Sequence, residues 1–229
     1  MSEPQIIKRA EWGARYRDGV GTRALPCKYG FFHHTVTYSA GAGATLAQDC
    51  AAVRNVEAVG NQRFGTMSYP YAITESGRIF QTLSENRIGA HTKNFNTTGT
   101  AITFIGNWEA NRPNQKMLDA AAWLIRDLER RGVTTRSTVW RGHYQVAATA
   151  CPGKYMKPEL AGIVAAARAP ITIPKEDDMP AQNKVLIAFV RPEKLAAAIA
   201  ALAKLDIRAY DADADEARIT RKYPAGSAQ

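Results

Sequence analysis

A break in composition near residue 170 sets the first limit on how this chain of 229 residues can fold. Residues 161–169 form an alanine-rich segment that Pro170 ends, and the next ten residues carry two prolines and an acidic cluster. We therefore predict a domain over residues 1–169, a linker over 170–182 and a small C-terminal domain over 183–229. The first part is long enough to enclose its own core, whereas about 45–50 residues bury little apolar surface.

Charge is divided unevenly between the two parts. Residues 1–170 carry 21 Lys and Arg against 12 Asp and Glu, whereas residues 171–229 carry nine of each. The first part is therefore attracted to an anionic partner such as nucleic acid, a membrane surface or a cell-wall polymer; a basic domain that is merely soluble is the alternative. The basic residues are scattered singly, which argues against nucleic acid. No stretch reaches the roughly 18–20 apolar residues of a membrane span, so we expect no stable membrane insertion.

The N-terminus and the cysteine content predict where the chain is made. Residues 1–10 include Glu3, Pro4 and Lys8 and lack the apolar core of a secretory signal. Three cysteines in a chain of this length are too few for a disulfide framework. We expect synthesis in a reducing cytoplasm, where each cysteine is either a metal ligand or part of a core.

Strand and helix patterns alternate before residue 170 and predict a mixed α/β domain, with a mixed central sheet flanked by helices. Thr45 begins a capping box for a helix whose apolar face includes Cys50, and Gly60 is expected to end it. Asn114 is expected to cap a second helix, which Gly132 ends. Strands are predicted over residues 29–36, 69–74, 78–83, 101–105 and 137–140, the second and third forming a hairpin.

The C-terminal segment has similar patterns on a smaller scale. Strands are predicted over residues 185–190 and 207–210, with an alanine-rich helix over 193–205 between them. A β-α-β unit of this size has little core, so we expect it to dock on the first domain or to oligomerise. The alternating carboxylates of residues 211–216 lack the glycine and distal glutamate of a calcium loop, so we interpret them as a solvated turn.

The four histidines carry most of the chemical information in the chain. His33 and His34 stand at the polar end of the first predicted strand, and His143 lies eight residues before Cys151. Imidazole and thiolate together suit zinc, and three protein ligands with one open position are typical of a catalytic zinc site. On spacing alone, ordinary loop residues are the alternative.

A series of motifs places these residues in a common context. The motifs occupy residues 9–15 (RAEWGAR), 31–35 (FFHHT), 68–71 (SYPY), 88–92 (IGAHT), 104–107 (FIGN) and the segment from His143 to Cys151, Pro152 and Gly153. In this order they resemble the peptidoglycan recognition proteins and the zinc N-acetylmuramoyl-L-alanine amidases to which that family belongs, including phage amidases. The resemblance spans residues 5–165.

The resemblance implies a role for each residue that matches a motif. His33, His143 and Cys151 match the three zinc ligands of the family. Tyr69 matches its catalytic tyrosine, whose hydroxyl lies near the water and the scissile carbonyl. Thr149 stands where relatives carry lysine or threonine, and its hydroxyl is expected to hydrogen-bond the developing oxyanion.

Other matched positions are expected to contact substrate or to pack. His34, His91 and Asn96 are candidate substrate-binding residues. We expect the side chain of His34 to point away from the metal, into sheet packing or the groove wall. For His91, substrate contact and a structural hydrogen bond in its loop are both open. Thr103 occupies the position of a glutamate base found in some relatives, so we expect no carboxylate base, and the metal itself would acidify the water.

The resemblance thus implies an enzyme, a zinc-dependent amidase that cleaves the bond between N-acetylmuramic acid and L-alanine in bacterial peptidoglycan. The expected cofactor is Zn²⁺, and the expected partner is peptidoglycan. For the C-terminal unit, which follows a linker, cell-wall binding is the leading hypothesis and dimerisation is the second, so an oligomer through this unit is left open. A basic chain without a signal sequence is most similar to a phage endolysin, made in the host cytoplasm and released to the cell wall. A cytoplasmic or prophage recycling amidase, a non-catalytic peptidoglycan-binding module and an inhibitory partner of another protein are the alternatives.

Overall fold

The structure of this protein is a computed structural model that describes residues 4–170, 186–188, 207–213 and 216–221. The chain divides into two compact units, Met1–Ala169 and Pro170–Gln229. Within the described ranges, no helix combines the length and the apolar character needed to span a bilayer.

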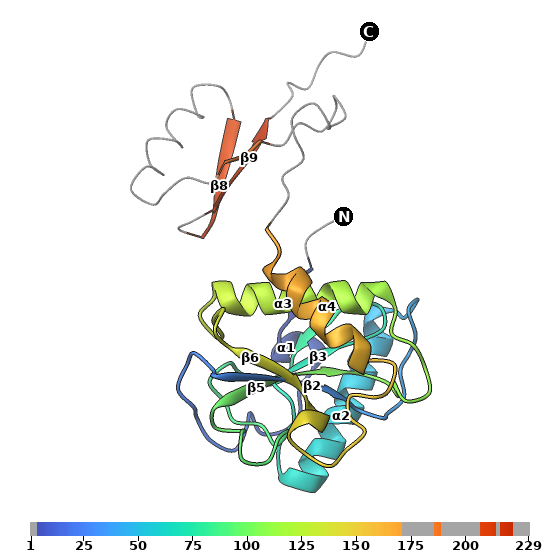
Figure 1. Ribbon diagram of the computed structural model, residues 1–229. Coiled ribbons are helices and arrows are strands. Elements are labelled where there is room, and N and C mark those ends of the chain that lie inside the picture. The colour runs from blue at the N-terminus through green and yellow to red at the C-terminus, as the bar shows by residue number, and fades with distance from the viewer. Residues whose placement is uncertain (1–3, 171–185, 189–206, 214–215, 222–229) are drawn as a thin grey trace. The chain divides into compact units, whose positions relative to one another are not determined.

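A six-stranded sheet forms the centre of the first unit (Figure 1). Its strands lie in the order β1-β4-β3-β5-β2-β6, and neighbouring strands run parallel except for the antiparallel pair β3 and β4. The turn of this hairpin contains Gly77, which adopts a left-handed φ of 85°. The strands are β1 (Ile6–Ile7), β2 (Tyr29–His34), β3 (Tyr71–Ile73), β4 (Ile79–Gln81), β5 (Gly99–Phe104) and β6 (Val139–Gly142).

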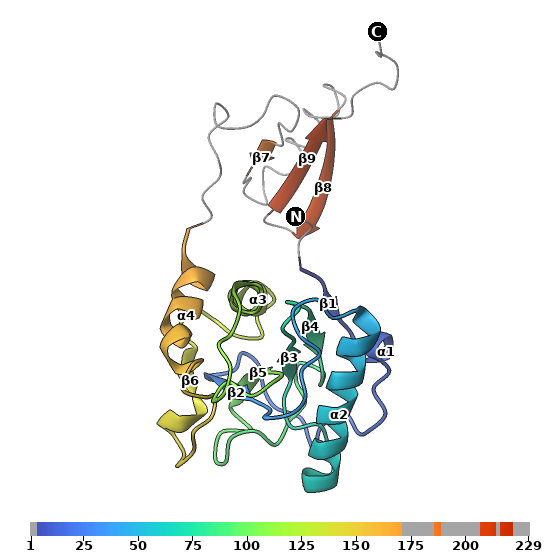
Figure 2. The same cartoon turned by 90° about the vertical axis from the view of Figure 1, so that its right-hand side faces the viewer.

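Helices cover both faces of the sheet, with α3 and α4 on one face and α2 on the other (Figure 2). The helices are α1 (Arg9–Trp12), α2 (Leu46–Phe64), α3 (Gln115–Arg130) and α4 (Leu160–Arg168), with short 3-10 turns at His143–Gln145 and Lys157–Glu159. The predicted class, a mixed central sheet flanked by helices, is confirmed.

Capping residues begin the two long helices where the sequence predicts. The Thr45 side chain accepts a hydrogen bond from the backbone N–H of Gln48 at 3.3 Å, and the Gln48 side chain accepts the Thr45 N–H at 2.8 Å. The Asn114 side chain accepts the backbone N–H of Met117 at 3.0 Å. Each cap satisfies an N–H group that has no partner within the helix.

The end of α2 differs from the prediction. The helix continues past Gly60 and stops at Gly65, whose left-handed φ of 70° closes it. Gly60 is instead a point of close approach, because a β-carbon there would lie 2.9 Å from the carbonyl oxygen of Thr66. Cys50 is buried as predicted, but Leu46, which the helical spacing places on the same apolar face as Cys50, is 48% exposed.

Two apolar cores fill the space between the sheet and its helices. The larger core, beneath α3 and α4, contains Phe32, Tyr71 and Leu124, and the smaller core, beneath α2, contains Val53 and Ala72. Tyr71 and Ala72 enter different cores because successive residues of a strand point to opposite faces. The sheet is therefore fixed from both sides, which gives its strand ends a rigid position.

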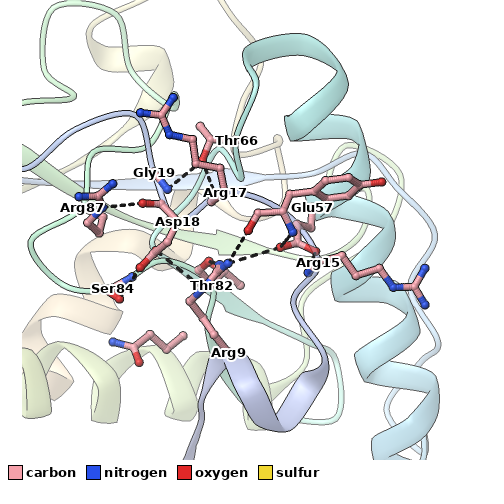
Figure 3. A network of polar contacts seen from close by, with 12 residues as sticks. Arg9, Arg15, Arg17, Asp18, Gly19, Glu57, Thr66, Thr82, Ser84 and Arg87 are labelled. Atoms are coloured by element: carbon pink, nitrogen blue, oxygen red, sulfur yellow. Dashed lines mark hydrogen bonds and ion pairs between the residues drawn. The ribbon is translucent and has the colours of Figure 1, made fainter.

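A polar network fastens the N-terminal segment to α2 and to the loop after β4 (Figure 3). The buried Glu57 carboxylate accepts the backbone N–H of Arg15 at 3.0 Å and lies 3.8 Å from the Arg9 guanidinium. Asp18 accepts hydrogen bonds from the backbone N–H and the hydroxyl of Ser84, at 2.9 and 2.6 Å. A buried carboxylate is tolerated here because its oxygens have partners.

The second unit contains a three-stranded antiparallel sheet in the order β7-β9-β8. Its strands are β7 (Leu186–Ala188), β8 (Ile207–Asp213) and β9 (Glu216–Arg221). The two predicted strands overlap β7 and β8, whereas β9 was not predicted. The turn predicted over 211–216 was wrong at both ends, because residues 211–213 belong to β8 and Glu216 begins β9. Alternating carboxylates also fit the period of a strand, which explains the error. The predicted helix over 193–205 lies outside the described residues.

Candidate metal centre

Three side chains of ligand type converge where β2 and β6 end. His33 lies near the end of β2, His143 directly follows β6, and Cys151 lies in the next loop. Because β2 and β6 are parallel neighbours, their carboxyl ends meet at one edge of the sheet. One ring nitrogen of each histidine and the Cys151 Sγ all lie within 4.8 Å of one another. This spacing allows a single cation to contact all three.

The loop that carries Cys151 is fixed from two sides. Its Sγ accepts the backbone N–H of His34 at 3.3 Å, and its carbonyl oxygen accepts the N–H of Tyr144 at 3.0 Å. Gly153 has a φ of 104°, and a β-carbon on it would lie 2.4 Å from the carbonyl carbon of Trp108. Only glycine permits this approach, so the thiol is held against the loop that follows β5.

Burial sets the protonation of the three groups. It lowers the pKa of His33 well below its ordinary value, and His91 and His143 lower it further. Burial also lowers the pKa of His143. Both imidazoles are therefore neutral at neutral pH, the form that binds a cation. Burial raises the pKa of the Cys151 thiol to about 11, so the thiolate forms only when a cation compensates its charge.

The donor set fits zinc. Two neutral imidazoles and one thiolate are ligands that zinc prefers, and a site with three protein ligands keeps a fourth position open. The His33 Nδ1 faces the Cys151 Sγ at 3.6 Å, while its Nε2 lies 3.2 Å from the hydroxyl of Thr92. Within the part of the chain that the structure describes, no carboxylate belongs to this cluster.

The two candidate catalytic hydroxyls, those of Tyr69 and Thr149, differ in burial and in their contacts near the cluster. Tyr69 is half-buried, and its ring centroid lies 5.2 Å from that of His33. Burial and the neighbouring Cys151 raise the pKa of Tyr69 to about 12, so its phenol stays a neutral donor. Thr149 is exposed, and its hydroxyl oxygen accepts the backbone N–H of Cys151 at 3.2 Å. Thr149 thus also shapes the ligand loop, a role that was not predicted.

The structure separates His34 from the cluster. Alternation along β2 sends its ring to the face opposite His33, where its Nδ1 accepts the backbone N–H of Trp108 at 3.3 Å. The residue is 7% exposed. The His34 ring points away from the candidate metal ligands, the orientation expected from the sequence, while contact between His34 and substrate stays a prediction.

His91 and Asn96 lie in one loop beside the cluster. The Asn96 Oδ1 accepts the backbone N–H groups of His91 and Thr92, at 3.1 and 2.8 Å, and so closes the loop. The buried His91 ring stands edge-on to His33, with 5.6 Å between centroids. Burial and the nearby Arg23 lower the pKa of His91 to about 3. The structural hydrogen bond, one of the two roles left open for His91, is present, because its Nδ1 lies 2.9 Å from the Thr92 hydroxyl.

Thr92 is the residue near the cluster that the sequence analysis missed. Its hydroxyl contacts both His33 and His91, although it stands 59 residues from His33 in the chain. A threonine after a histidine gives no signal by its spacing, so only the fold reveals this contact. Thr103 pairs with His33 in the β2–β5 register, and its buried hydroxyl has no hydrogen-bond partner among the described residues.

Comparisons with known sequences agree with this geometry. The sequence model of the family described as N-acetylmuramoyl-L-alanine amidase matches residues 23–154, which include all three candidate ligand residues. Peptidoglycan-recognition protein SC1a/b of Drosophila simulans is 31% identical over 162 residues, which cover 69% of this chain and 84% of that protein. The peptidoglycan recognition protein of Trichoplusia ni is 30% identical over 157 residues, covering 68% and 85%.

Solved structures show the same similarity. Drosophila PGRP-LB superimposes with a TM-score of 0.65 at 27% identity, covering 69% of this chain and 94% of that one. Human PGRP-IBETAC, solved in complex with glycosamyl muramyl pentapeptide, gives 0.62 at 27% identity and covers 68% and 93%. The fold and the three-ligand cluster define a peptidoglycan recognition protein-like domain. The chain belongs to the N-acetylmuramoyl-L-alanine amidase family.

Proposed function

We propose that this protein is a zinc-dependent N-acetylmuramoyl-L-alanine amidase, which hydrolyses the amide bond between N-acetylmuramic acid and L-alanine in bacterial peptidoglycan. The convergence of His33, His143 and Cys151, with ligand atoms within 4.8 Å of one another, carries the proposal. Tyr69 beside this cluster supplies a hydroxyl of the kind the reaction needs. Membership of the amidase family and relatives named for peptidoglycan recognition support the substrate class.

The residues in and beside the cluster have separate roles in the proposed hydrolysis. Zinc, when bound, supplies a Lewis acid and lowers the pKa of a water molecule at its open position. His33, His143 and Cys151 would hold the ion. The neutral phenol of Tyr69 donates a hydrogen bond toward the carbonyl oxygen as negative charge develops there, and the hydroxyl of Thr149 adds a second, uncharged donor.

A non-catalytic peptidoglycan-binding module is the second candidate. The names of the relatives as recognition proteins and the excess of Lys and Arg in residues 1–170 favour it. Binding alone requires no metal ligands, whereas this chain keeps two histidines and a cysteine within 4.8 Å of one another. The complete ligand set therefore favours the enzyme.

We further propose that the enzyme works as an endolysin, made in a host cytoplasm and acting on the cell wall after release. The basic first unit would be attracted to anionic wall polymers, with binding that weakens as salt rises. The C-terminal unit would add wall affinity. Deleting residues 175–229 should then reduce binding to intact walls and spare hydrolysis of soluble muropeptides. Unchanged wall binding with loss of dimer mass would assign this unit to dimerisation instead.

Mass spectrometry of the products released from purified peptidoglycan tests the enzyme proposal. We expect stem peptides with a free N-terminal L-alanine and intact glycan strands, released only without a zinc chelator and again after zinc is restored. Cuts within the glycan or within the peptide would contradict the assigned bond. No release, with the protein still sedimenting on the wall, would support the binding module.

A further inference from the structure

The Thr92 hydroxyl joins the metal-facing histidine to a second, buried histidine. Its Oγ1 lies 3.2 Å from the His33 Nε2 and 2.9 Å from the His91 Nδ1. The three residues are only 1%, 2% and 7% exposed, for His33, Thr92 and His91, so water competes little for these hydrogen bonds. A hydroxyl has one proton to donate, and each nitrogen of a neutral imidazole either donates or accepts. The hydroxyl can therefore donate to only one of the two rings, whereas its oxygen can accept from one ring or from both.

The ligand geometry fixes the direction of the hydrogen bond at His33. Its Nδ1 faces the Cys151 Sγ at 3.6 Å and is the nitrogen that a cation would contact, so it must carry a free lone pair. The ring proton then resides on Nε2, which donates to the Thr92 Oγ1. The proton of the Thr92 hydroxyl is then available to the His91 Nδ1, which lies 2.9 Å away. In that arrangement His91 carries its own proton on Nε2, which has no hydrogen-bond partner among the described residues.

We propose that Thr92 and His91 are positioning residues that hold His33 in the tautomer able to bind the metal; this inference rests on the proposed zinc site. A threonine hydroxyl alone donates as readily as it accepts, and would also stabilise the His33 tautomer that has a bare Nε2. His91 removes this ambiguity, because its Nδ1 takes the hydroxyl proton. Thr92 is left as an acceptor, and only the Nε2-protonated form of His33 gains a hydrogen bond.

The surrounding loop keeps this pair in place. The Asn96 side chain holds the backbone N–H groups of both His91 and Thr92. The His91 ring packs beside Phe31 as well as His33, with 6.2 and 5.6 Å between ring centroids. Phe31 and His33 point to the same face of β2. One strand therefore positions both the His33 ring and the Phe31 ring, which packs against His91. This assigns the buried His91 to orientation of the ligand and not to substrate binding.

Zinc affinity of the full-length protein, measured by competition with a chromogenic chelator, tests the proposal. Thr92→Val removes the hydroxyl with little change in volume, and we expect zinc affinity to fall about 10- to 100-fold. Thr92→Ser keeps a hydroxyl and should restore it. His91→Phe keeps a ring but removes the acceptor, and should cause a smaller fall. Thr98→Val is the matched control, because the Thr98 hydroxyl in the same loop makes no hydrogen bond to another described residue.

The outcomes separate this proposal from the proposed function. Wild-type affinity in Thr92→Val would overturn the positioning role, whereas a wild-type protein that binds no zinc would overturn the zinc amidase itself. Nitrogen-15 NMR of the zinc-loaded wild type is a second test. It requires no variant, so its result is valid even where a variant fails to fold. We expect the His91 ring to carry its proton on Nε2 and to leave Nδ1 bare. A proton on the His91 Nδ1 would break the hydrogen-bond chain and overturn the proposal.

Discussion

The two faces of β2 use neighbouring residues for different purposes. On one face Phe32 packs against Trp140 with 5.1 Å between ring centroids, inside the larger apolar core. On the other face the His33 ring lies 4.5 Å from that of His143 and 5.2 Å from that of Tyr69, within the ligand cluster. Close packing on the first face fixes the backbone from which the ligand projects on the second.

His33 and His34 show the same difference between the two faces of β2, here within one residue type. The ring of His33 offers one nitrogen to the cluster and the other to a hydroxyl, whereas the ring of His34 accepts a backbone N–H of Trp108. Both residues are buried, so burial does not separate them. The face of the strand decides which histidine joins the cluster of candidate ligands and which is a structural acceptor.

The largest expected effect is that of His33→Ala on metal content and turnover. Loss of one of three ligands should lower turnover by on the order of 10³-fold or more and leave the purified protein without stoichiometric zinc. Elemental analysis and stem-peptide release measure the two quantities. His34→Ala is the matched control and should keep its zinc. Full turnover in His33→Ala would exclude His33 as a ligand.

Phe32→Ala alters the face of β2 that packs in the larger core, so it should change stability rather than turnover. Truncating a fully buried phenylalanine should lower the free energy of unfolding by about 3–5 kcal/mol, because it leaves a cavity in the larger core. Denaturant titration measures this change. Val139→Ala on the adjacent strand should change stability by less than about 1 kcal/mol, since Val139 is 42% exposed. A Phe32→Ala protein as stable as wild type would contradict this division between the faces.

Tyr69→Phe should lower kcat by about 10²–10³-fold with little change in stability, because it removes only the donor aimed at the developing charge. Tyr71→Phe is the control on the opposite face. Its ring is fully buried in the larger core, so turnover should not change. Steady-state kinetics on a soluble muropeptide compares the two variants. Equal losses of kcat in both would mean that the effect arises from packing and not from the Tyr69 hydroxyl.

His34→Leu should have the smallest of these effects. It leaves the buried Trp108 N–H without its acceptor, which lowers the free energy of unfolding by about 1–3 kcal/mol. His34→Asn places an oxygen near the position of Nδ1 and should recover part of this loss. Zinc affinity should stay at the wild-type value in both. A loss of zinc comparable to that of His33→Ala would show that the two faces are not independent.

Local features of the fold were predictable from the sequence, and contacts between distant segments were not. Thr45 and Asn114 mark helix starts because a cap is formed by hydrogen bonds within three residues. Gly60 misled the prediction of a helix end, because its role depends on the backbone of Thr66 passing close by. The strand β8 was predicted to end at Tyr210 instead of Asp213 because the alternating carboxylates that follow Tyr210 suggested a turn.

The same limit applies to the candidate site. His33, His143 and Cys151 were predicted because their residue types and the order of their motifs indicate metal chemistry. Thr92 was missed because its function depends on the fold of a loop that returns to β2. A hydroxyl has no metal preference of its own and becomes informative only when its neighbours are known.

The fit of Gly153 against Trp108 has a consequence for how this protein can vary. His143 is tied to the sheet by β6 and Cys151 to the loop after β5, so the distance between these two ligands is set at both ends of the segment that joins them. Residues 147–150 between those ends are exposed. Apart from Thr149, whose hydroxyl accepts the Cys151 N–H, substitutions there can change the rim of the cluster without moving His143 or Cys151. We therefore expect sequence variation at the alanines of this segment to change the surface beside the cluster while the spacing of His143 and Cys151 is preserved.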